Sequence, residues 1–493
     1  FGVKPFYYIL HDDFFAFASE YKALLKIPTL ERKLNPVAVY DYLVLGKTEL
    51  EEEGLFKDIF ELMPAHSFRF DLHNGTFKKW KYYSLEFNAE WQQFNGHTFS
   101  KYTEDIRELI INAIRLRLRS DVSVGTCLSG GLDSSTIVCV INNLLSQNSI
   151  KQVGDLQKVF TACYSNPMHS DVDESSWAKI VVDNTQTSWH QTFPKPEELI
   201  NEFEDLVYAQ DIPFFSSSTY AQYKVMQLAH NNGIKVTLDG QGSDELFAGY
   251  SPQFTSFIAE ALKNFSLSTI SNNLTHLDNS FANVEMLTGY PAKIIAANLF
   301  SGYFKNRGFR SSRKEFNYIN DEFWNENKKR LHYLINSLPT SLNKMLYSQF
   351  TGPDLKALMR TGDRNSMRFS IESRMPFADD VNLIEYVFGI SSAYKVRNGQ
   401  NKYLLRNSMK NMLPAEIVQR KDKLGFATPE KQWFQQLKNP LREMVSSNQN
   451  DEYINWTELN KNWDALFNKS LEVSTIRLWR FINFAVWRRV FDI

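Results

Sequence analysis

The chain has 493 residues, of which 43% are hydrophobic and 14% aromatic, and these values predict a globular protein of two or three domains. Its 55 basic and 56 acidic residues nearly cancel, which excludes the electrostatic surface that nucleic acid or an anionic membrane requires. No apolar stretch approaches the ~20 residues that span a bilayer, and the three cysteines form no CxxC pair. We therefore expect a cytoplasmic protein without a membrane segment, disulfides or a zinc site.

The first part of the chain, to about residue 95, is predicted to be mostly β. Residues 6–9 (FYYI) prefer strands, and residues 11–13 (HDD) supply a polar turn before a second apolar run. The dipeptide Asn74-Gly75 predicts a second hairpin, because these residues tolerate the positive φ angles of a tight turn. Nothing upstream of residues 6–9 offers a pairing partner, so either the chain is a fragment or its first strand lies at a sheet edge.

A helix-rich region is predicted from about Gly96. Seven apolar residues recur there at near-helical spacing: Ile106, Leu109, Ile110, Ala113, Ile114, Leu116 and Leu118. Further along, short apolar runs (VSVGTCLS, KVFTACY, IKVTLD) alternate with helical patterns. This alternation indicates a parallel sheet with helices on both faces, which binds ligands beyond the carboxyl ends of its strands. From about Ser256 the pattern is mainly helical, and the last segment (STIRLWRFINFAVWRRVF) is expected to be a helix docked on the core.

The most informative stretch is TCLSGGLDSST, in which a strand runs into glycines and hydroxyls and then directly into a helix. Glycines let a backbone approach a ligand closely, the hydroxyls of Ser129, Ser134 and Ser135 can donate hydrogen bonds, and a new helix offers unpaired N–H groups. The combination predicts an anion-binding loop rather than an ordinary capped turn, and it is neither a Walker loop nor a dinucleotide fingerprint. Because Asp133 would repel a phosphate there, an intervening magnesium ion is implied.

SGGLDSS resembles the pyrophosphate-binding loop of the ATP pyrophosphatases, which split ATP between its α and β phosphates. VTLDGQGSDELFAGY resembles the second signature of the asparagine synthetases within that group. The second stretch repeats the logic of the first, since a strand ends in glycines and a carboxylate, and we expect Asp133 and Asp244 to hold one Mg²⁺ from two sides. Later segments (DIPFFSSSTY, DRNSMRFSIESRMPFAD, and the run from GQNKYLLR to KLGFATP) extend the resemblance over the whole chain.

The resemblance implies an ATP and pyrophosphate site made of the two loops: Leu128, Ser129, Gly130, Gly131, Asp133, Ser134, Ser135, Asp239 and Gly240. It also implies catalytic roles for Lys423, Asp244 and Tyr250, with Lys421 as the near competitor of Lys423. A cation at that position would stabilise the charge that builds on the departing pyrophosphate. The candidate substrate contacts are Gln241, Ser243, Glu245 and Arg374.

For the whole chain, the resemblance implies two domains: residues 1–95 as the C-terminal part of a class II (Ntn-type) glutamine amidotransferase domain, and residues 96–493 as the synthetase domain. The synthetase fold would be an adenine nucleotide alpha hydrolase-like parallel sheet followed by a helical part. The implied enzyme is a carbon–nitrogen ligase, a glutamine-hydrolysing asparagine synthase with ATP and Mg²⁺ as cofactors. It would convert aspartate, ATP and glutamine or ammonia to asparagine, AMP and pyrophosphate through an acyl-adenylate. Residue 1 is Phe and no cysteine precedes Cys127, so the nucleophile half of the first domain is expected to be missing, and ammonium but not glutamine should support the reaction.

The acceptor stays open, because many asparagine synthetases carry glutamate where this chain has Gln241. Glutamine cannot act as a base or give magnesium a full negative charge, so its expected role is hydrogen bonding. The alternatives are a ligase or cyclase acting on another carboxylate, in a natural product, peptide or glycan, and a non-catalytic ATP-binding relative. The intact Asp133, Asp244 and Lys423 speak against the last of these. No nucleic acid or membrane partner is expected, and a homodimer stays open.

Overall fold

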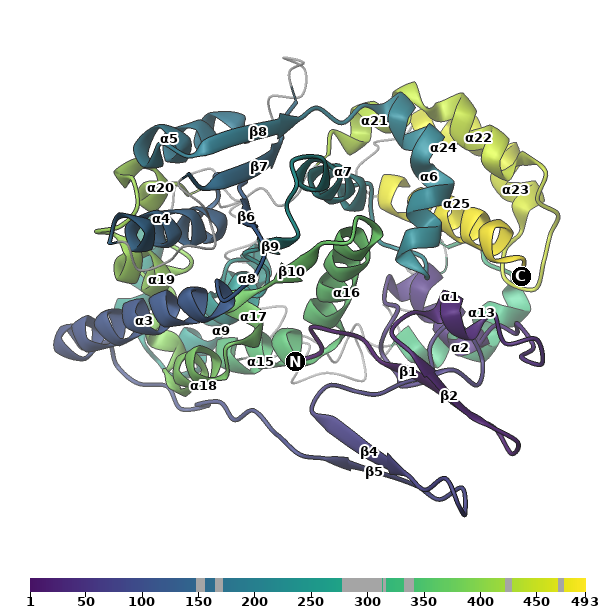
Figure 1. Ribbon diagram of the computed structural model, residues 1–493, viewed down its shortest axis with the longest axis horizontal. Coiled ribbons are helices and arrows are strands. Elements are labelled where there is room, and N and C mark those ends of the chain that lie inside the picture. The colour runs from purple at the N-terminus through teal and green to yellow at the C-terminus, as the bar shows by residue number, and fades with distance from the viewer. Residues whose placement is uncertain are drawn as a thin grey trace.

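The computed structural model describes residues 1–147, 156–164, 172–276, 313, 316–331, 341–421, 428–468 and 474–493. A five-stranded sheet, in the order β10-β9-β6-β7-β8 with every neighbouring pair parallel, lies at the centre of the larger part of the molecule (Figure 1). Its strands are β6 (Val124–Cys127), β7 (Lys158–Ala162), β8 (Ser188–Thr192), β9 (Val236–Leu238) and β10 (Glu372–Arg374). The predicted α/β architecture with a parallel sheet is confirmed.

Helices cover both faces of this sheet, as the apolar strand sequences predicted. Figure 1 shows α4 (Leu132–Ser146) and α5 (Ser175–Thr185) on one side of it, and α7 (Ser218–Asn231) and α16 (Pro353–Arg368) on the other. The predicted helix after Gly96 is α3 (Gly96–Arg117), and Ile106, Ile110 and Ile114 on its inner face are fully buried. No helix in the described ranges is both long enough and apolar enough to cross a membrane.

The rest of this larger part is mainly helical in the described residues, as the sequence predicted. Its helices are α6 (Pro196–Gln210), α8 (Ser243–Phe247), α9 (Ser251–Lys263), α10 (Leu267–Thr275), α13 (Asp321–Asn327), α15 (Leu342–Thr351), α17 (Pro376–Asp379), α18 (Val381–Gly389), α19 (Tyr403–Met409), α20 (Ala415–Gln419), α21 (Glu430–Gln436), α22 (Lys438–Ser446), α23 (Trp456–Lys461), α24 (Trp463–Asn468) and α25 (Ser474–Phe491).

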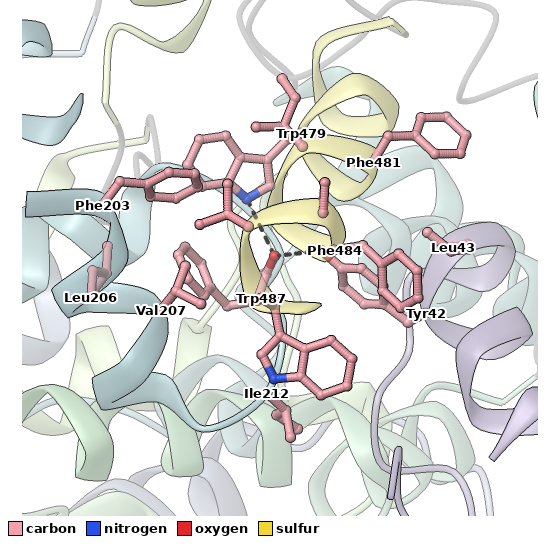
Figure 2. Close-up of a cluster of buried hydrophobic side chains, with 14 of the residues drawn as sticks. Tyr42, Leu43, Phe203, Leu206, Val207, Ile212, Trp479, Phe481, Phe484 and Trp487 are labelled. Carbon is pink, nitrogen blue, oxygen red and sulfur yellow. Dashed lines mark hydrogen bonds between the residues drawn. The ribbon is translucent and has the colours of Figure 1, made fainter. Parts of the chain in front are cut away.

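The last helix, α25, packs its aromatic face into the core. Figure 2 shows Trp479, Phe484 and Trp487 between Phe203 on α6 and Tyr42 in the N-terminal part. The indole of Trp479 and the hydroxyl of Tyr42 both donate to the carbonyl oxygen of Phe214, at 3.2 and 3.1 Å. The expected docking of the terminal helix on the core is therefore confirmed, and its tryptophans also satisfy their polar atoms.

The N-terminal part contains the two predicted hairpins. β1 (Tyr7–Leu10) pairs with β2 (Phe15–Ala18) across the predicted polar turn, and β4 (His66–Phe70) pairs with β5 (Phe77–Lys81) across Asn74-Gly75. Of the two alternatives for the first strand, the structure does not show the edge position, because β3 (Phe60–Glu61) pairs with its other side and β1 is central. Helices α1 (Tyr21–Leu24), α2 (Pro36–Tyr40) and a π-helical turn (Asp41–Leu45) complete this part, which is less purely β than predicted.

Buried ion pairs join the N-terminal part to α16. The Nζ atom of Lys356 lies 2.9 Å from Oε2 of Glu61, and Nε of Arg360 lies 2.5 Å from Oε1 of Glu49. All four side chains are almost fully enclosed. Because Lys356 and Arg360 are one helical turn apart, one face of α16 carries both contacts.

Candidate active site

A cavity of about 510 Å³ lies where β6 and β9 end, the carboxyl edge at which parallel sheets bind ligands. Both signature loops line it. The predicted residues that face this cavity are Ser129, Gly131, Asp133, Ser134, Asp239, Gly240, Gln241, Asp244 and Tyr250. Two loops more than 100 residues apart in the sequence are thus brought to one site, as their shared pattern predicted.

The first loop turns sharply between β6 and α4. Gly130 has φ +76°, and a Cβ atom there would lie 2.4 Å from the backbone nitrogen of Ala178, so only glycine fits. The hydroxyls of Ser129 and Ser134 lie 3.1 Å apart, and the N–H of Gly131 donates to the Ser129 hydroxyl. The loop therefore holds its donors in a fixed arrangement at the N-terminus of α4, where the helix favours an anion. Three predicted residues, Leu128, Gly130 and Ser135, support the loop without lining the cavity.

The two predicted metal-binding carboxylates converge on a single point, and that point is the side chain of Lys402. Nζ of Lys402 lies 2.7 Å from both carboxylate oxygens of Asp133 and 2.7 Å from Oδ1 of Asp244. The Ser243 hydroxyl, one of the candidate substrate contacts, instead donates to Oδ1 of Asp133 at 2.7 Å. Sequence reasoning did not select Lys402, which lies in the GQNKYLLR run directly before α19. Its backbone lies in the left-handed region, with φ +51°, a conformation that residues other than glycine rarely adopt.

This donor set fits a magnesium ion that arrives with phosphate oxygens. Asp133 and Asp244 supply two carboxylates at one place, and Mg²⁺ prefers one or two carboxylates completed by water and substrate phosphates. No cluster of three or more His, Cys, Asp or Glu side chains in the described residues could hold a metal ion. Asp133 and Asp244 could therefore supply two of the oxygen ligands of such an ion, at the place where Lys402 supplies a positive charge.

Asp239 ends β9 beside the first loop. Burial raises the pKa of its carboxyl to about 6, against hydrogen bonds from Gln222 and from the backbone N–H groups of Gly240 and Gln241 that favour the charged form. The two loops touch here, since a Cβ atom on Gly240 would lie 2.9 Å from Cβ of Asp133. Asp239 is thus held as an enclosed, hydrogen-bonded carboxylate.

Tyr250 lines the cavity and donates its hydroxyl proton to Oε1 of Glu245 at 2.9 Å. Burial, followed by the negative charge of Glu245, raises the pKa of Tyr250 far above its usual value. Tyr250 is therefore a neutral hydrogen-bonding group at neutral pH. Glu245, a candidate substrate contact, is 2% exposed and is not among the residues that line the cavity; it accepts the Tyr250 hydroxyl proton from behind the cavity wall.

Two arginines that sequence reasoning did not select, Arg406 and Arg420, line the cavity. Arg420 donates to Oε1 of Glu174 at 2.6 Å and to the carbonyl oxygen of Gly130 at 3.1 Å, which fastens the first loop from outside. Arg406 donates to the backbone and side-chain oxygens of Asn401, the residue before Lys402. Both arginines stand in the run from GQNKYLLR to KLGFATP, and this membership is the signal that could have suggested them.

Arg374, a candidate substrate contact, is not among the residues that line the cavity, and its contact with substrate stays a prediction. Its guanidinium donates to the carbonyl oxygens of Arg117 and Arg119, both at 2.7 Å, and pairs with Glu372. The end of β10 is thereby tied to the end of α3. Lys423 lies outside the described residues, whereas Lys421 is the last described residue before that gap.

Comparisons with known proteins agree with this site. The family profile described as asparagine synthase matches residues 105–489, and the profile described as a glutamine amidotransferase domain matches residues 1–83. An asparagine synthetase [glutamine-hydrolyzing] 3 of Bacillus subtilis is 26% identical over 85% of this chain and 62% of its own length. A putative asparagine synthetase of Methanocaldococcus jannaschii is 33% identical over 52% of this chain and 47% of its own length. A Gibberella zeae protein named amidase chry2 is 23% identical over 100% of this chain and 76% of its own length.

The chain thus spans 62% and 47% of the first two relatives. Within that span the agreement is specific, because the asparagine synthase profile covers both signature loops and the helices that complete the cavity. The chain belongs to the asparagine synthase family.

Proposed function

We propose that this protein is an ATP-dependent ligase that converts a carboxylate into an amide through an acyl-adenylate. The observation that supports this most strongly is the Asp133–Lys402–Asp244 arrangement. The two signature loops present paired carboxylates, and Lys402, directly before α19, supplies a cation beside the anion-binding loop. An oxygen of the acceptor carboxylate would attack the α-phosphorus of ATP, and pyrophosphate would leave. Ammonia would then attack the acyl carbon and displace AMP.

The residues of the cavity have distinct proposed roles in these steps. The backbone of Gly131 and the hydroxyls of Ser129 and Ser134 would bind the departing pyrophosphate at the N-terminus of α4. Asp133 and Asp244 would hold Mg²⁺, which when bound screens the phosphate charge. Lys402, together with Lys423 as the sequence implies, would stabilise the charge that builds on the leaving group.

The first acceptor to test is aspartate, because two relatives of this chain are named asparagine synthetases. The product would then be asparagine, and glutamine or ammonia would be the nitrogen source. A second acceptor class, a carboxylate of a natural product, peptide or glycan, is favoured by Gln241, which lines the cavity without a charge where many asparagine synthetases have glutamate. In this proposal residues 1–95 are the glutaminase-like domain and 96–493 the synthetase. The proposed setting is the cytoplasm, and a homodimer is the assembly to test.

Pyrophosphate release with Mg-ATP, measured against a panel of carboxylates that includes aspartate, tests the proposal. Glutamine and ammonium are supplied separately, and Asp133→Asn serves as the inactive control. We expect one carboxylate to stimulate release and to yield an amide. ATP binding without stimulation by any carboxylate would instead support a non-catalytic role.

A further inference from the structure

A line of buried amide side chains leads from the cavity into the interior of the protein. The Nε2 atom of Gln222 donates to Oδ2 of Asp239 at 3.4 Å, and Oε1 of Gln222 accepts from Nδ2 of Asn365 at 3.0 Å. Oδ1 of Asn365 in turn accepts from Nε2 of Gln210 at 2.8 Å. Asn365 and Gln210 are fully enclosed. Three carboxamides from α7, α16 and α6 therefore form one continuous hydrogen-bonded chain that ends on a carboxylate of the cavity.

Gln210, the amide farthest from the cavity, has only one allowed orientation. A carboxamide has a donor end and an acceptor end, whereas a guanidinium only donates and a backbone carbonyl only accepts. Oxygen atoms of Gln210 accept from NH1 of Arg360, at 3.2 Å for the backbone oxygen and 3.4 Å for Oε1. Nε2 of Gln210 also donates to the carbonyl oxygen of Thr361 at 3.2 Å. Gln210 must therefore present its NH₂ group to Asn365, which has to receive it with Oδ1.

The same constraint passes to the end of the chain. With its oxygen turned to Gln210, Asn365 directs its NH₂ group to the carbonyl oxygen of Thr219, at 3.0 Å, and to Oε1 of Gln222. Gln222 is then left with its NH₂ group facing Asp239. The orientation of every amide is thus determined by groups that can only donate, the Arg360 guanidinium, or only accept, the carbonyl oxygens of Thr361 and Thr219.

The direction matters because Asp239 is enclosed and carries a charge. Its other donors are the backbone N–H groups of the next two residues, and the charge of Asp133 opposes its ionisation. If Gln222 were reversed, a carbonyl oxygen would face the carboxylate in place of a donor, and a buried charge without its hydrogen bond is strongly disfavoured.

We infer that Arg360, Gln210 and Asn365 are positioning residues, whose hydrogen bonds keep Gln222 oriented as a donor to Asp239 in the cavity. Arg360 is itself held by Glu49, at 2.5 Å, in the segment that matches the glutamine amidotransferase profile. The N-terminal part therefore anchors the chain that orders this side of the cavity. The inference rests on the proposed function in one respect, because one of the two measurements that test it is Mg-ATP binding. The other measurement, unfolding in urea, needs no ATP.

The substitution Asn365→Asp tests the inference, because aspartate has nearly the same shape but no proton to give to Gln222. Gln222 is then expected to turn its NH₂ group toward residue 365 and its oxygen toward Asp239. We expect Mg-ATP affinity, measured by calorimetry, to fall about tenfold, the effect of losing one hydrogen bond to a charged group. Asn365→Leu is the matched control, since it removes the bonds without reversing Gln222, and its affinity should stay within about threefold of the wild type.

A double-mutant cycle with Asp239→Asn separates hydrogen-bond direction from added charge. Asparagine at position 239 can donate to the reversed Gln222, so Asn365→Asp should have little further effect in that background. An equal loss in both backgrounds would overturn the inference, because the added charge alone would then explain it. An equal loss in Asn365→Leu and Asn365→Asp would also overturn it.

The wild type, Asn365→Asp, Asp239→Asn and the double variant are also unfolded in urea without ATP. This measurement tests the inference even if the wild type binds no ATP and the proposed function fails. We expect Asn365→Asp to lower the urea midpoint in the wild type and much less in Asp239→Asn. If Asn365→Asp does not fold, recovery of folding in the double variant supports the inference. Additive midpoint shifts, or no recovery, would overturn it.

Discussion

Replacing Lys402 by methionine tests the central arrangement of the cavity. The Lys402 side chain is 3% exposed and lies 2.7 Å from a carboxylate oxygen of each of Asp133 and Asp244, whose side chains are 14% and 12% exposed. Removing one partner of a buried ion pair costs about 3–5 kcal/mol, because the opposite charge stays behind. Since water reaches the carboxylates in part, we expect Lys402→Met to lower the free energy of unfolding by about 3 kcal/mol, the lower end of that range.

Magnesium should reverse much of this loss. Without the ammonium, Asp133 and Asp244 face each other as an open oxygen site, and Mg²⁺ that binds the folded state alone stabilises it by mass action. At about one hundred times its Kd, the ion would restore about 2.7 kcal/mol, nearly the whole deficit. The wild type, whose ammonium competes for the same oxygens, should gain less.

The measurement is urea unfolding followed by tryptophan fluorescence, with and without Mg²⁺. Lys356→Met is the matched control, because Lys356 is equally buried and pairs at 2.9 Å with the carboxylate of Glu61. Both variants should lose stability, but only Lys402→Met should recover it in magnesium. Equal recovery in the two variants, or none in either, would refute the reasoning that Asp133 and Asp244 form a cation site.

Three further predictions follow from the site and the core. Asp133→Asn and Asp244→Asn should each lower magnesium-dependent pyrophosphate release at least about tenfold while circular dichroism stays unchanged, since each removes a charge from the pair. Lys423→Ala should slow adenylation more than it weakens ATP binding, in a comparison of kcat with KM; a larger effect of Lys421→Ala would assign the role to that lysine instead. Burial lowers the pKa of Lys395 to about 7, so the folded state binds fewer protons than the unfolded state between about pH 7 and 10, and wild-type stability should rise with pH there. Lys395→Met should therefore stabilise more at pH 7 than at pH 8 or 9 in urea unfolding. Its advantage should shrink by about 1 kcal/mol from pH 7 to 8, where the folded lysine is still partly protonated, and by about 1.3 kcal/mol from pH 8 to 9.

The parts of the site that could be predicted are those whose chemistry is local in the sequence. The glycines and hydroxyls around Asp133 follow a strand and precede a helix, so their convergence at the carboxyl edge of a parallel sheet follows from the element order alone. Asp244 has the same context after β9. The hairpin at Asn74-Gly75 was predictable for the same reason, because two residues specify the turn.

The parts that could not be predicted depend on pairings between distant residues. Lys402 has the sequence context of any helix-starting lysine, and only the fold brings it between two carboxylates that precede it by more than 150 residues. Arg374 lies in a recognisable motif, yet its guanidinium donates to carbonyl oxygens at the end of α3 and not to a group of the cavity. No sequence upstream offers β1 a partner, but β3, which follows it by about fifty residues, pairs with the side of β1 opposite to β2.

Helix α16 shows why hydrophobic periodicity alone misses such connections. Its buried face toward the N-terminal part carries Lys356 and Arg360, so a pattern search reads that face as solvent-exposed. Thr361, the next residue along, lines the cavity instead. A single helix thus has one face fastened to the N-terminal part by enclosed ion pairs and another that shapes the cavity wall. An ion pair broken in such a place leaves an uncompensated buried charge on α16. Substitutions of Glu49 or Glu61 therefore act on a helix that lines the cavity, although neither glutamate lines the cavity itself.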